Sequence, residues 1–308
     1  MAKNIGTGDA VFTTNFSYFA TTEVISLVGA TPVFIDIDEK TFNINPELLE
    51  IQIKKTLDEG KLKAKAIISV DLFGQLSDYK KIEKIAKKYN LFLIEDAAQS
   101  FGASCEGKKS CSFGDVAATS FFPAKPLGCY GDGGAIFTND SKLASIFKSI
   151  RMHGQGKDKY DNIRIGLNSR LDTLQAVVLL NKLEIFDNEL ILRNKIAEFY
   201  SNNLKKYLNI PFVENLNKSA WAQYSILVTN SSQREKLLQH LSSNGIPTAI
   251  YYKKIFSKLN IYKNYNNYKF PVSEKCSNQI FSIPMHPYLS EDESSFIVNE
   301  IIKFYKND

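Results

Sequence analysis

Short apolar runs alternate with longer amphipathic segments through the first half of the chain, and this alternation constrains the fold more than any other feature. We predict strands over residues 10–14, 32–36, 64–70, 91–94 and 117–122. We predict helices that end near residue 28 and that span 45–57 and 77–89, with Ser77 as the N-cap of the last one. Strands that alternate with helices favour a mostly parallel sheet with right-handed crossovers, so the predicted class is α/β.

The pattern changes after residue 170. Residues 171–208 contain neither Gly nor Pro and carry apolar residues at three- and four-residue spacing, which predicts one long helix. Beyond it we predict strands over 223–229 and 247–252, helices over 234–243 and 290–305, and a loop over 258–268. We therefore divide the chain into a large domain, 1–170, and a second part, 171–308, made of the linking helix and a small α+β domain.

Composition excludes several classes of protein. The 38 basic and 33 acidic residues give a net charge of +5, which suits an anionic ligand, but no basic run is dense enough for nucleic acid. The four cysteines lack CxxC spacing and the three histidines are scattered, so we expect no metal site and no disulfide framework. Without a long apolar segment or a signal-peptide pattern, we expect a cytoplasmic protein with no membrane partner.

Residues 91–138 carry the chemistry. Asp96 follows a predicted strand, and ligands of open α/β sheets bind beyond the carboxyl ends of such strands. Lys125 lies between Pro123 and Pro126 on a short connection that leads into several glycines, so its backbone is constrained. Lysine forms Schiff bases, and pyridoxal phosphate (PLP) pairs such a lysine with an acid at its ring nitrogen. For an isolated pair, a surface lysine and a capping aspartate are the more common roles.

Six motifs resemble the DegT/DnrJ/EryC1/StrS family of PLP-dependent sugar aminotransferases: EDAAQSFGA, TSFFPAKPLG, CYGDGGAIFTND, RMHGQG, GLNSRLDTLQA and IPMHPYL. They are most similar to its transaminases that act on UDP-2-acetamido-2-deoxy-3-oxo-glucuronate. The resemblance implies the aspartate-aminotransferase-like fold (fold type I) and a homodimer with shared active sites. It also implies a UDP-sugar substrate, glutamate as amino donor, and a place in lipopolysaccharide (O-antigen) synthesis.

The resemblance assigns residues around the cofactor. Lys125 would form the Schiff base with PLP and move protons, and Asp96 would pair with the ring nitrogen. Gln99, where we expect a helix to begin, would lie beside the ring hydroxyl. Ser120 would bind the phosphate, and the ring of Tyr18 would lie over that of PLP.

Further assignments concern the substrate and the partner subunit. Asn168 would reach the phosphate in the partner's site, and Arg170 would bind a carboxylate with its bidentate guanidinium. The alternative for this segment is a helix entry capped by Ser169 or Asp172. Tyr251 and Tyr252 would contact the sugar, although relatives have His-Tyr there. Asp71 receives no role.

The front of the chain departs from the family pattern. Family members have a further segment before the point where this chain begins, including a Gly-Thr turn that binds the PLP phosphate, and the turn at residues 6–8 does not match it. We expect a truncated chain or an internal methionine at position 1. An inactive product is therefore one alternative, and a 4-keto sugar aminotransferase is another. Lys125 disfavours the PLP-dependent dehydratases, which have His there, and YGDGGA lacks the GxGxxG spacing of nicotinamide enzymes.

Overall fold

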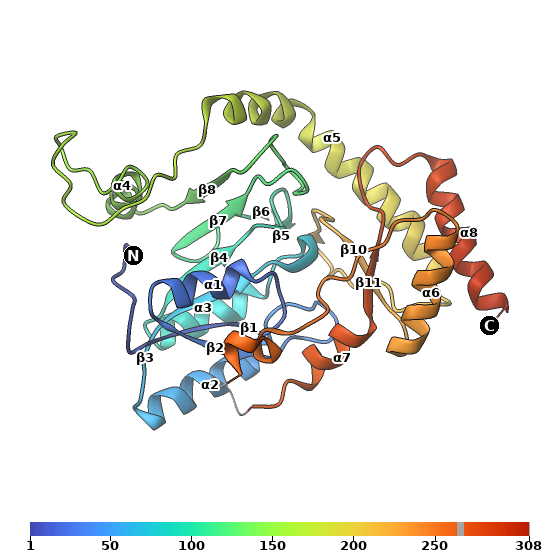
Figure 1. Ribbon diagram of the computed structural model, residues 1–308, viewed down its shortest axis with the longest axis horizontal. Helices are drawn as coiled ribbons and strands as arrows, with labels where there is room; N and C mark the ends of the chain where they lie inside the picture. The colour runs from blue at the N-terminus through green and yellow to red at the C-terminus, as the bar shows by residue number, and fades with distance from the viewer. Residues whose placement is uncertain (264–267, 308) are drawn as a thin grey trace.

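The computed structural model describes residues 1–263 and 268–307 and is built on a six-stranded sheet (Figure 1). The strand order is β2-β1-β3-β4-β7-β8. The strands are β1 (Asp9–Thr14), β2 (Thr31–Ile35), β3 (Lys63–Val70), β4 (Phe92–Asp96), β7 (Val116–Ser120) and β8 (Gly134–Phe137). All neighbours are parallel except β7 and β8, which are antiparallel. The predicted α/β class with a mostly parallel sheet is confirmed.

Both faces of this sheet are covered, which explains why its strands are continuous apolar runs. The helices of this half are α1 (Ala20–Leu27), α2 (Pro46–Glu59), α3 (Tyr79–Lys88) and α4 (Ser141–Ile150). Phe12 packs on one face, in a cluster with Ile53 of α2 and Ile82 of α3. Its neighbour Val11 packs on the other face with Ile25 of α1. Successive strand residues thus enter different cores, as a two-sided sheet requires.

The start of α3 differs from the prediction by one residue. Asp78, not Ser77, is the N-cap, and its carboxylate accepts a hydrogen bond from the backbone N–H of Lys81. The Ser77 hydroxyl instead donates to the carbonyl of Val70 at 2.8 Å. Both residue types can cap a helix, so composition alone could not choose between neighbours.

The long predicted helix is α5 (Thr173–Leu204), which runs from the large sheet to a second core (Figure 1). There the strands β10 (Tyr224–Leu227) and β11 (Ile280–Ile283) pair antiparallel, and α6 (Ser231–Ser243), α7 (Pro271–Gln279) and α8 (Glu291–Asn307) flank them. Neither α7 nor β11 was predicted from the sequence. The helix α7 is polar, and the apolar run of β11 is only four residues long.

The strand predicted over residues 247–252 is wrong. Ala249 forms a single isolated bridge with Ser282, after which the chain turns at Tyr251. Pro247 lacks the N–H that a continuous ladder needs. Part of the loop predicted over 258–268 lies outside the described residues. The described part includes the short 3-10 helix Asn260–Tyr262, and Phe256–Lys258 forms another such turn.

A small sheet and a tight contact connect the two halves. β5 (Ser104–Cys105) pairs with both β6 (Lys108–Lys109) and β9 (Asn217–Lys218). The carbonyl of Gly74 accepts a hydrogen bond from the N–H of Ala220 at 2.9 Å. Gly74 has a φ of +97°, and a Cβ there would lie 2.6 Å from the nitrogen of Trp221, so only glycine fits. No described helix is both long and apolar enough to cross a membrane.

Candidate active site

The carboxyl ends of the parallel strands bring four of the predicted residues to one edge of the large sheet. Tyr18 follows β1, Asp96 ends β4 and Ser120 ends β7. In the register of the sheet Asp96 pairs with Ala118, so Ser120 extends just past it. Lys125 lies on the connection from β7 to β8. This is the edge where open α/β sheets bind ligands.

Asp96 is held by donors from three segments. Its Oδ2 accepts the hydroxyl of Thr21 at 2.7 Å, and its Oδ1 accepts the N–H of Ala98 at 3.2 Å. Its carbonyl accepts the N–H of Asp71 at 3.1 Å. Burial raises the pKa of the Asp96 carboxyl, while Thr21, Ala98 and the charge of Lys125 lower it. The carboxylate is therefore oriented and lies within the electrostatic reach of the lysine.

Lys125 is a partly buried amine on a constrained turn. Its N–H donates to the carbonyl of Phe122 at 2.8 Å, and a Cβ on Gly128 would lie 2.5 Å from the Pro123 oxygen, so the turn closes tightly. Burial lowers the pKa of the Lys125 ammonium, and Asp96 opposes this. Its Nζ forms no hydrogen bond with the residues that the structure describes. A lysine with a lowered pKa is more often neutral, and the neutral amine is the nucleophile.

Gln99 and Tyr252 meet at the same site. Gln99 is buried, accepts the N–H of Phe73 through Oε1 at 2.9 Å, and donates from Nε2 to the Tyr252 hydroxyl at 3.2 Å. Residues 97–102 form a series of turns, so the helix expected to begin at Gln99 is absent from this described segment. Glutamine is fixed there by hydrogen bonds rather than by helix geometry.

The remaining aromatic residues lie around Tyr252. The ring of Tyr18 is 6.4 Å from that of Tyr252, and 60% of its surface is exposed. The ring of Tyr251 is 5.7 Å from that of Tyr252, and the peptide between them is cis. Burial raises the pKa of the Tyr252 phenol far above its ordinary value, so Tyr252 is a neutral hydrogen-bonding group.

Ser120, at the end of β7, has a hydrogen bond within its own turn. Its hydroxyl accepts the N–H of Phe122 at 3.2 Å.

Asn168 and Arg170 lie apart from this group, on an arm of residues 151–172 that contains no regular helix or strand (Figure 1). Both side chains are exposed, and neither forms a hydrogen bond or ion pair with the Asp96 and Lys125 group within the described residues. The backbone of Asn168 pairs with Met152. Asp172 precedes α5, but its side chain accepts no hydrogen bond from the first turn of the helix.

Two groups at the site were missed. Thr21 belongs to α1, and its contact with Asp96 spans 75 residues of sequence, so only the sheet register reveals it. The second group is the pair Asp71 and Glu95, which are both fully buried. The sequence signals for this pair were an acid directly after a strand, for Asp71, and an acid inside a strand, for Glu95. Among the described residues there is no cluster of three His, Cys, Asp or Glu side chains that could hold a metal ion.

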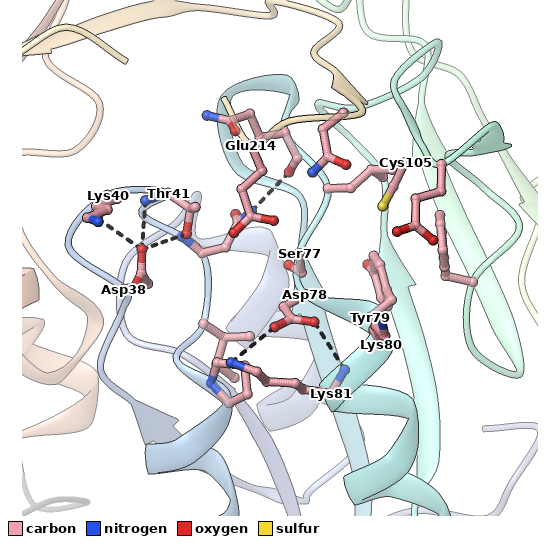
Figure 2. Close-up of a pocket in the computed structure, with 18 of the residues that line it drawn as sticks. Asp38, Lys40, Thr41, Ser77, Asp78, Tyr79, Lys80, Lys81, Cys105 and Glu214 are labelled. Atoms are coloured by element: carbon pink, nitrogen blue, oxygen red, sulfur yellow. Dashed lines mark hydrogen bonds and ion pairs between the residues drawn. The ribbon is translucent and has the colours of Figure 1, made fainter. Parts of the chain in front are cut away.

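A cavity of about 790 Å³ lies elsewhere and is not this site (Figure 2). It is lined by the start of α2, the start of α3, the β5–β6 hairpin and the segment before β9, and by neither Lys125 nor Asp96. Some of its charged side chains pair with each other. For example, Lys81 lies 2.9 Å from Glu47 and 3.4 Å from Asp78. We therefore place the candidate active site at Lys125 and Asp96.

Comparison with known proteins identifies the family of the chain. Residues 1–302 match the DegT/DnrJ/EryC1/StrS aminotransferase family. The chain is 49% identical to the UDP-2-acetamido-2-deoxy-3-oxo-D-glucuronate aminotransferase of Pseudomonas aeruginosa, over 94% of this chain and 77% of the relative. It is 33% identical to the UDP-N-acetyl-3-dehydro-alpha-D-glucosamine 3-aminotransferase of Acidithiobacillus ferrooxidans, over 97% of this chain and 79% of the relative.

Solved structures give the same family. A Brucella abortus DegT DnrJ EryC1 StrS aminotransferase is 50% identical with a TM-score of 0.96, over 99% of this chain and 81% of that one. The Bacillus subtilis protein NtdA, solved with bound cofactor PMP, is 26% identical with a TM-score of 0.86, over 99% of this chain and 69% of that one. PMP is the amine form of PLP, and the free amine of Lys125 beside a carboxylate fits that cofactor. The protein is thus a PLP-dependent enzyme and belongs to the DegT/DnrJ/EryC1/StrS aminotransferase family.

Proposed function

We propose that the protein transfers the amino group of glutamate to the 3-keto group of a UDP-linked 2-acetamido-2-deoxy uronic acid. The product would enter bacterial surface polysaccharide such as the O-antigen of lipopolysaccharide. The observation that carries the proposal is the oriented Asp96 carboxylate within electrostatic reach of the partly buried amine of Lys125. The sugar is inferred from the 49% identity to the Pseudomonas aeruginosa aminotransferase.

The residues around PLP divide the work. Lys125 would hold the cofactor covalently and, when released, would carry the proton taken from the amino donor. Asp96 would keep a proton on the ring nitrogen. When bound, PLP supplies an electron sink for the carbon that loses this proton. Gln99 would bind the ring hydroxyl, Ser120 the phosphate, and Tyr18 the face of the ring.

The substrate side is assigned to the tyrosines and the arm. Tyr252, whose hydroxyl is held by Gln99, would bind the sugar, and Tyr251 would add a second hydroxyl. Arg170 is exposed and able to offer its guanidinium to the carboxylate of the uronic acid or of glutamate. Asn168 would reach the PLP phosphate of a partner subunit. These roles follow from residue chemistry and from the family resemblance.

We propose that the active unit is a homodimer. The apolar side chains of Leu174, Val177 and Leu180 recur every three residues on α5 and are between half and four-fifths exposed. The neighbouring arm exposes Ile163, Ile165 and Leu167 in the same way. Exposed apolar side chains in such number are typical of an interface, and a second copy that covered them would receive the arm with Asn168 and Arg170.

The same proposal includes the division of the chain and its location. We assign residues 1–170 to the PLP-binding domain and 171–308 to the linking helix and the small domain. The four cysteines are free, which agrees with a reducing compartment, and we place the protein in the cytoplasm.

Product analysis tests the function. The purified chain would be incubated with PLP, glutamate and a UDP-linked 3-keto or 4-keto uronic acid, and 2-oxoglutarate and the aminated sugar would be measured by mass spectrometry and NMR. We expect amination at carbon 3. Lys125→Ala should abolish it, whereas Lys84→Ala, on the exposed side of α3, should not. Amination of the 4-keto sugar alone, or an unimpaired Lys125→Ala, would contradict the proposal.

A further inference from the structure

Two carboxyl groups that the proposed chemistry does not use are buried below the candidate site. Asp71 follows β3 and Glu95 lies in β4, and neither has any exposed surface. Each of the two residues is connected to Asp96. The N–H of Asp71 donates to the carbonyl of Asp96, and Glu95 is the chain neighbour of Asp96. Buried acids are rare unless hydrogen bonds or charge partners stabilise them, so the partners of each group matter.

Glu95 has the environment of an ionised carboxylate. Its Oε1 accepts the N–H of Cys111 at 2.7 Å, and its Oε2 accepts the N–H of Phe113 at 2.8 Å. Burial raises the pKa of Glu95, while the hydrogen bonds from backbone N–H donors to both of its oxygens favour the charged form. A glutamine in place of Glu95 would direct its NH₂ group, which is a donor, at one of the two backbone N–H donors.

Asp71 has one oxygen whose only partner is a hydroxyl that can rotate. Its Oδ1 accepts the N–H of Ser77 at 3.0 Å and the hydroxyl of Tyr79 at 2.9 Å, and its Oδ2 accepts the Ser100 hydroxyl at 2.8 Å. A hydroxyl both donates and accepts, so a proton on Oδ2 is compatible with Ser100. Burial, and after it the charge of Glu95, raises the pKa of Asp71 well above its ordinary value.

The other titratable groups packed against the pair do not supply a compensating charge. Burial raises the pKa of the Tyr79 phenol well above its ordinary value, and the charges of Asp71 and Glu95 raise it further. The pKa of the Cys111 thiol is raised to about 12, again mainly by burial. Both groups are neutral near pH 7. Asp71 and Glu95 are close enough for the charge of one to shift the pKa of the other, and no cation among the described residues pairs with them. Two such buried carboxyls keep one proton between them.

We propose that Asp71 and Glu95 share one proton, with the proton on Asp71 and the negative charge on Glu95, and that this pair positions Asp96 and Gln99. The positioning runs through hydrogen bonds already described. Asp71 contacts Ser100, the neighbour of Gln99, and its backbone contacts Asp96. It also fixes Ser77 and Tyr79, which lie on the cavity wall where α3 begins (Figure 2). The catalytic consequence rests on the proposed function, but the protonation does not.

The protonation can be measured on the chain without PLP or substrate. Infrared difference spectra near neutral pH between the unsubstituted chain and Asp71→Asn should contain the carbonyl band of a protonated carboxyl group. The same spectrum of a folded Asp96→Asn chain shows whether the neighbouring acid, Asp96, contributes to this band. The absence of the band from the Asp71→Asn difference would overturn the proposal, whether or not the protein is a sugar aminotransferase.

Substitutions test the positioning. Asparagine is the isostere of a protonated aspartate, so Asp71→Asn should fold and should retain kcat within about threefold. Asp71→Ala leaves the N–H of Ser77 without its acceptor, removes the nearer of the two acceptors of the Tyr79 hydroxyl, and should lower kcat about 10- to 100-fold. Glu95→Gln should be more harmful than Asp71→Asn, because it opposes backbone donors. Equal damage from Asp71→Asn and Asp71→Ala, or an Asp71→Asn chain that does not fold, would contradict the assignment of the proton.

Discussion

The Nε2 atom of Gln99 donates a hydrogen bond to the hydroxyl of Tyr252 at 3.2 Å, across 153 residues of sequence. Gln99 is anchored on its other side by the N–H of Phe73, and Tyr252 follows the bridge between Ala249 and Ser282. This single contact therefore joins the turn after β4 to the second half of the chain. The residue next to the proposed cofactor and the residue next to the proposed sugar are held by the same bond.

A double-mutant cycle tests this link. Gln99→Ala and Tyr252→Phe each remove the bond, so their effects on the free energy of unfolding should be non-additive by about 1 kcal/mol. Urea denaturation of the two single variants and the double variant measures this coupling. As a control, Gln99→Ala combined with Tyr251→Phe should be additive, because Tyr251 forms no hydrogen bond with Gln99 in the described structure. Full additivity in the first cycle would contradict the link.

Removal of the Asp96 charge should lower the pKa of Lys125. The carboxylate raises this pKa against the effect of burial, so in Asp96→Asn the amine should become neutral at lower pH. The rate at which a small aldehyde and a hydride donor modify Lys125 in the cofactor-free chain reports the shift as a function of pH. The exposed Asp132→Asn should leave the profile unchanged. An unchanged profile, or a shift to higher pH, in Asp96→Asn would contradict the interaction between the two groups.

Thr21 and Thr22 are adjacent but should respond differently to substitution by valine. The Thr21 hydroxyl stabilises the Asp96 carboxylate and lowers its pKa, so Thr21→Val should raise that pKa and move the acid limb of activity to higher pH. It should also destabilise the chain by about 1 to 2 kcal/mol. The buried hydroxyl of Thr22 has no hydrogen-bond partner in the described structure, so Thr22→Val should be neutral or stabilising. Rate–pH profiles and thermal denaturation distinguish the two.

The buried proton on Asp71 should make stability depend on pH. The folded-state pKa is raised above the ordinary 3.8, so between these values the folded chain binds more protons than the unfolded chain. Stability should therefore fall as pH rises through this window, with a limiting slope of about 1.4 kcal/mol per unit. Asp71→Asn has no proton to lose, so the difference between the two denaturation curves isolates the effect. A difference that grew in the opposite direction would contradict the buried proton.

The proposed dimer should depend on the apolar stripe of α5. Leu180 is 64% exposed in the single chain, and Leu180→Glu would place a charge in the interface that we propose. We expect a monomer in analytical ultracentrifugation and a loss of activity. Lys195→Glu, an exposed change further along the same helix, should remain dimeric. A fully active Leu180→Glu monomer would argue against shared active sites.

Much of the large sheet was predictable because its strands are buried on both faces and read as apolar runs, such as Ile67 and Ile68 of β3. Local polarity could not separate Ser77 from Asp78 as a helix cap. Nor could it reveal that residues 247–252 form only one bridge. Contacts such as Thr21 with Asp96 depend on strand order. The location of Asn168 and Arg170 relative to a site would depend on the second chain of the homodimer that we propose, and sequence patterns of one chain do not predict such a contact.

The close approach at Gly74 also has a consequence for the order of folding. The Ser219 hydroxyl and the Ala220 N–H both reach the Gly74 carbonyl across about 145 residues, so this contact closes a very large loop. Closing such a loop is entropically unfavourable until other contacts have formed, and long-range contacts slow folding. We therefore expect the segment from Asp71 to Gln75 to reach its native conformation only after Trp221 has been synthesised. The same holds for the turn that bears Gln99. The strands of the large sheet would pair earlier, and the catalytic arrangement would be completed among the last events of maturation.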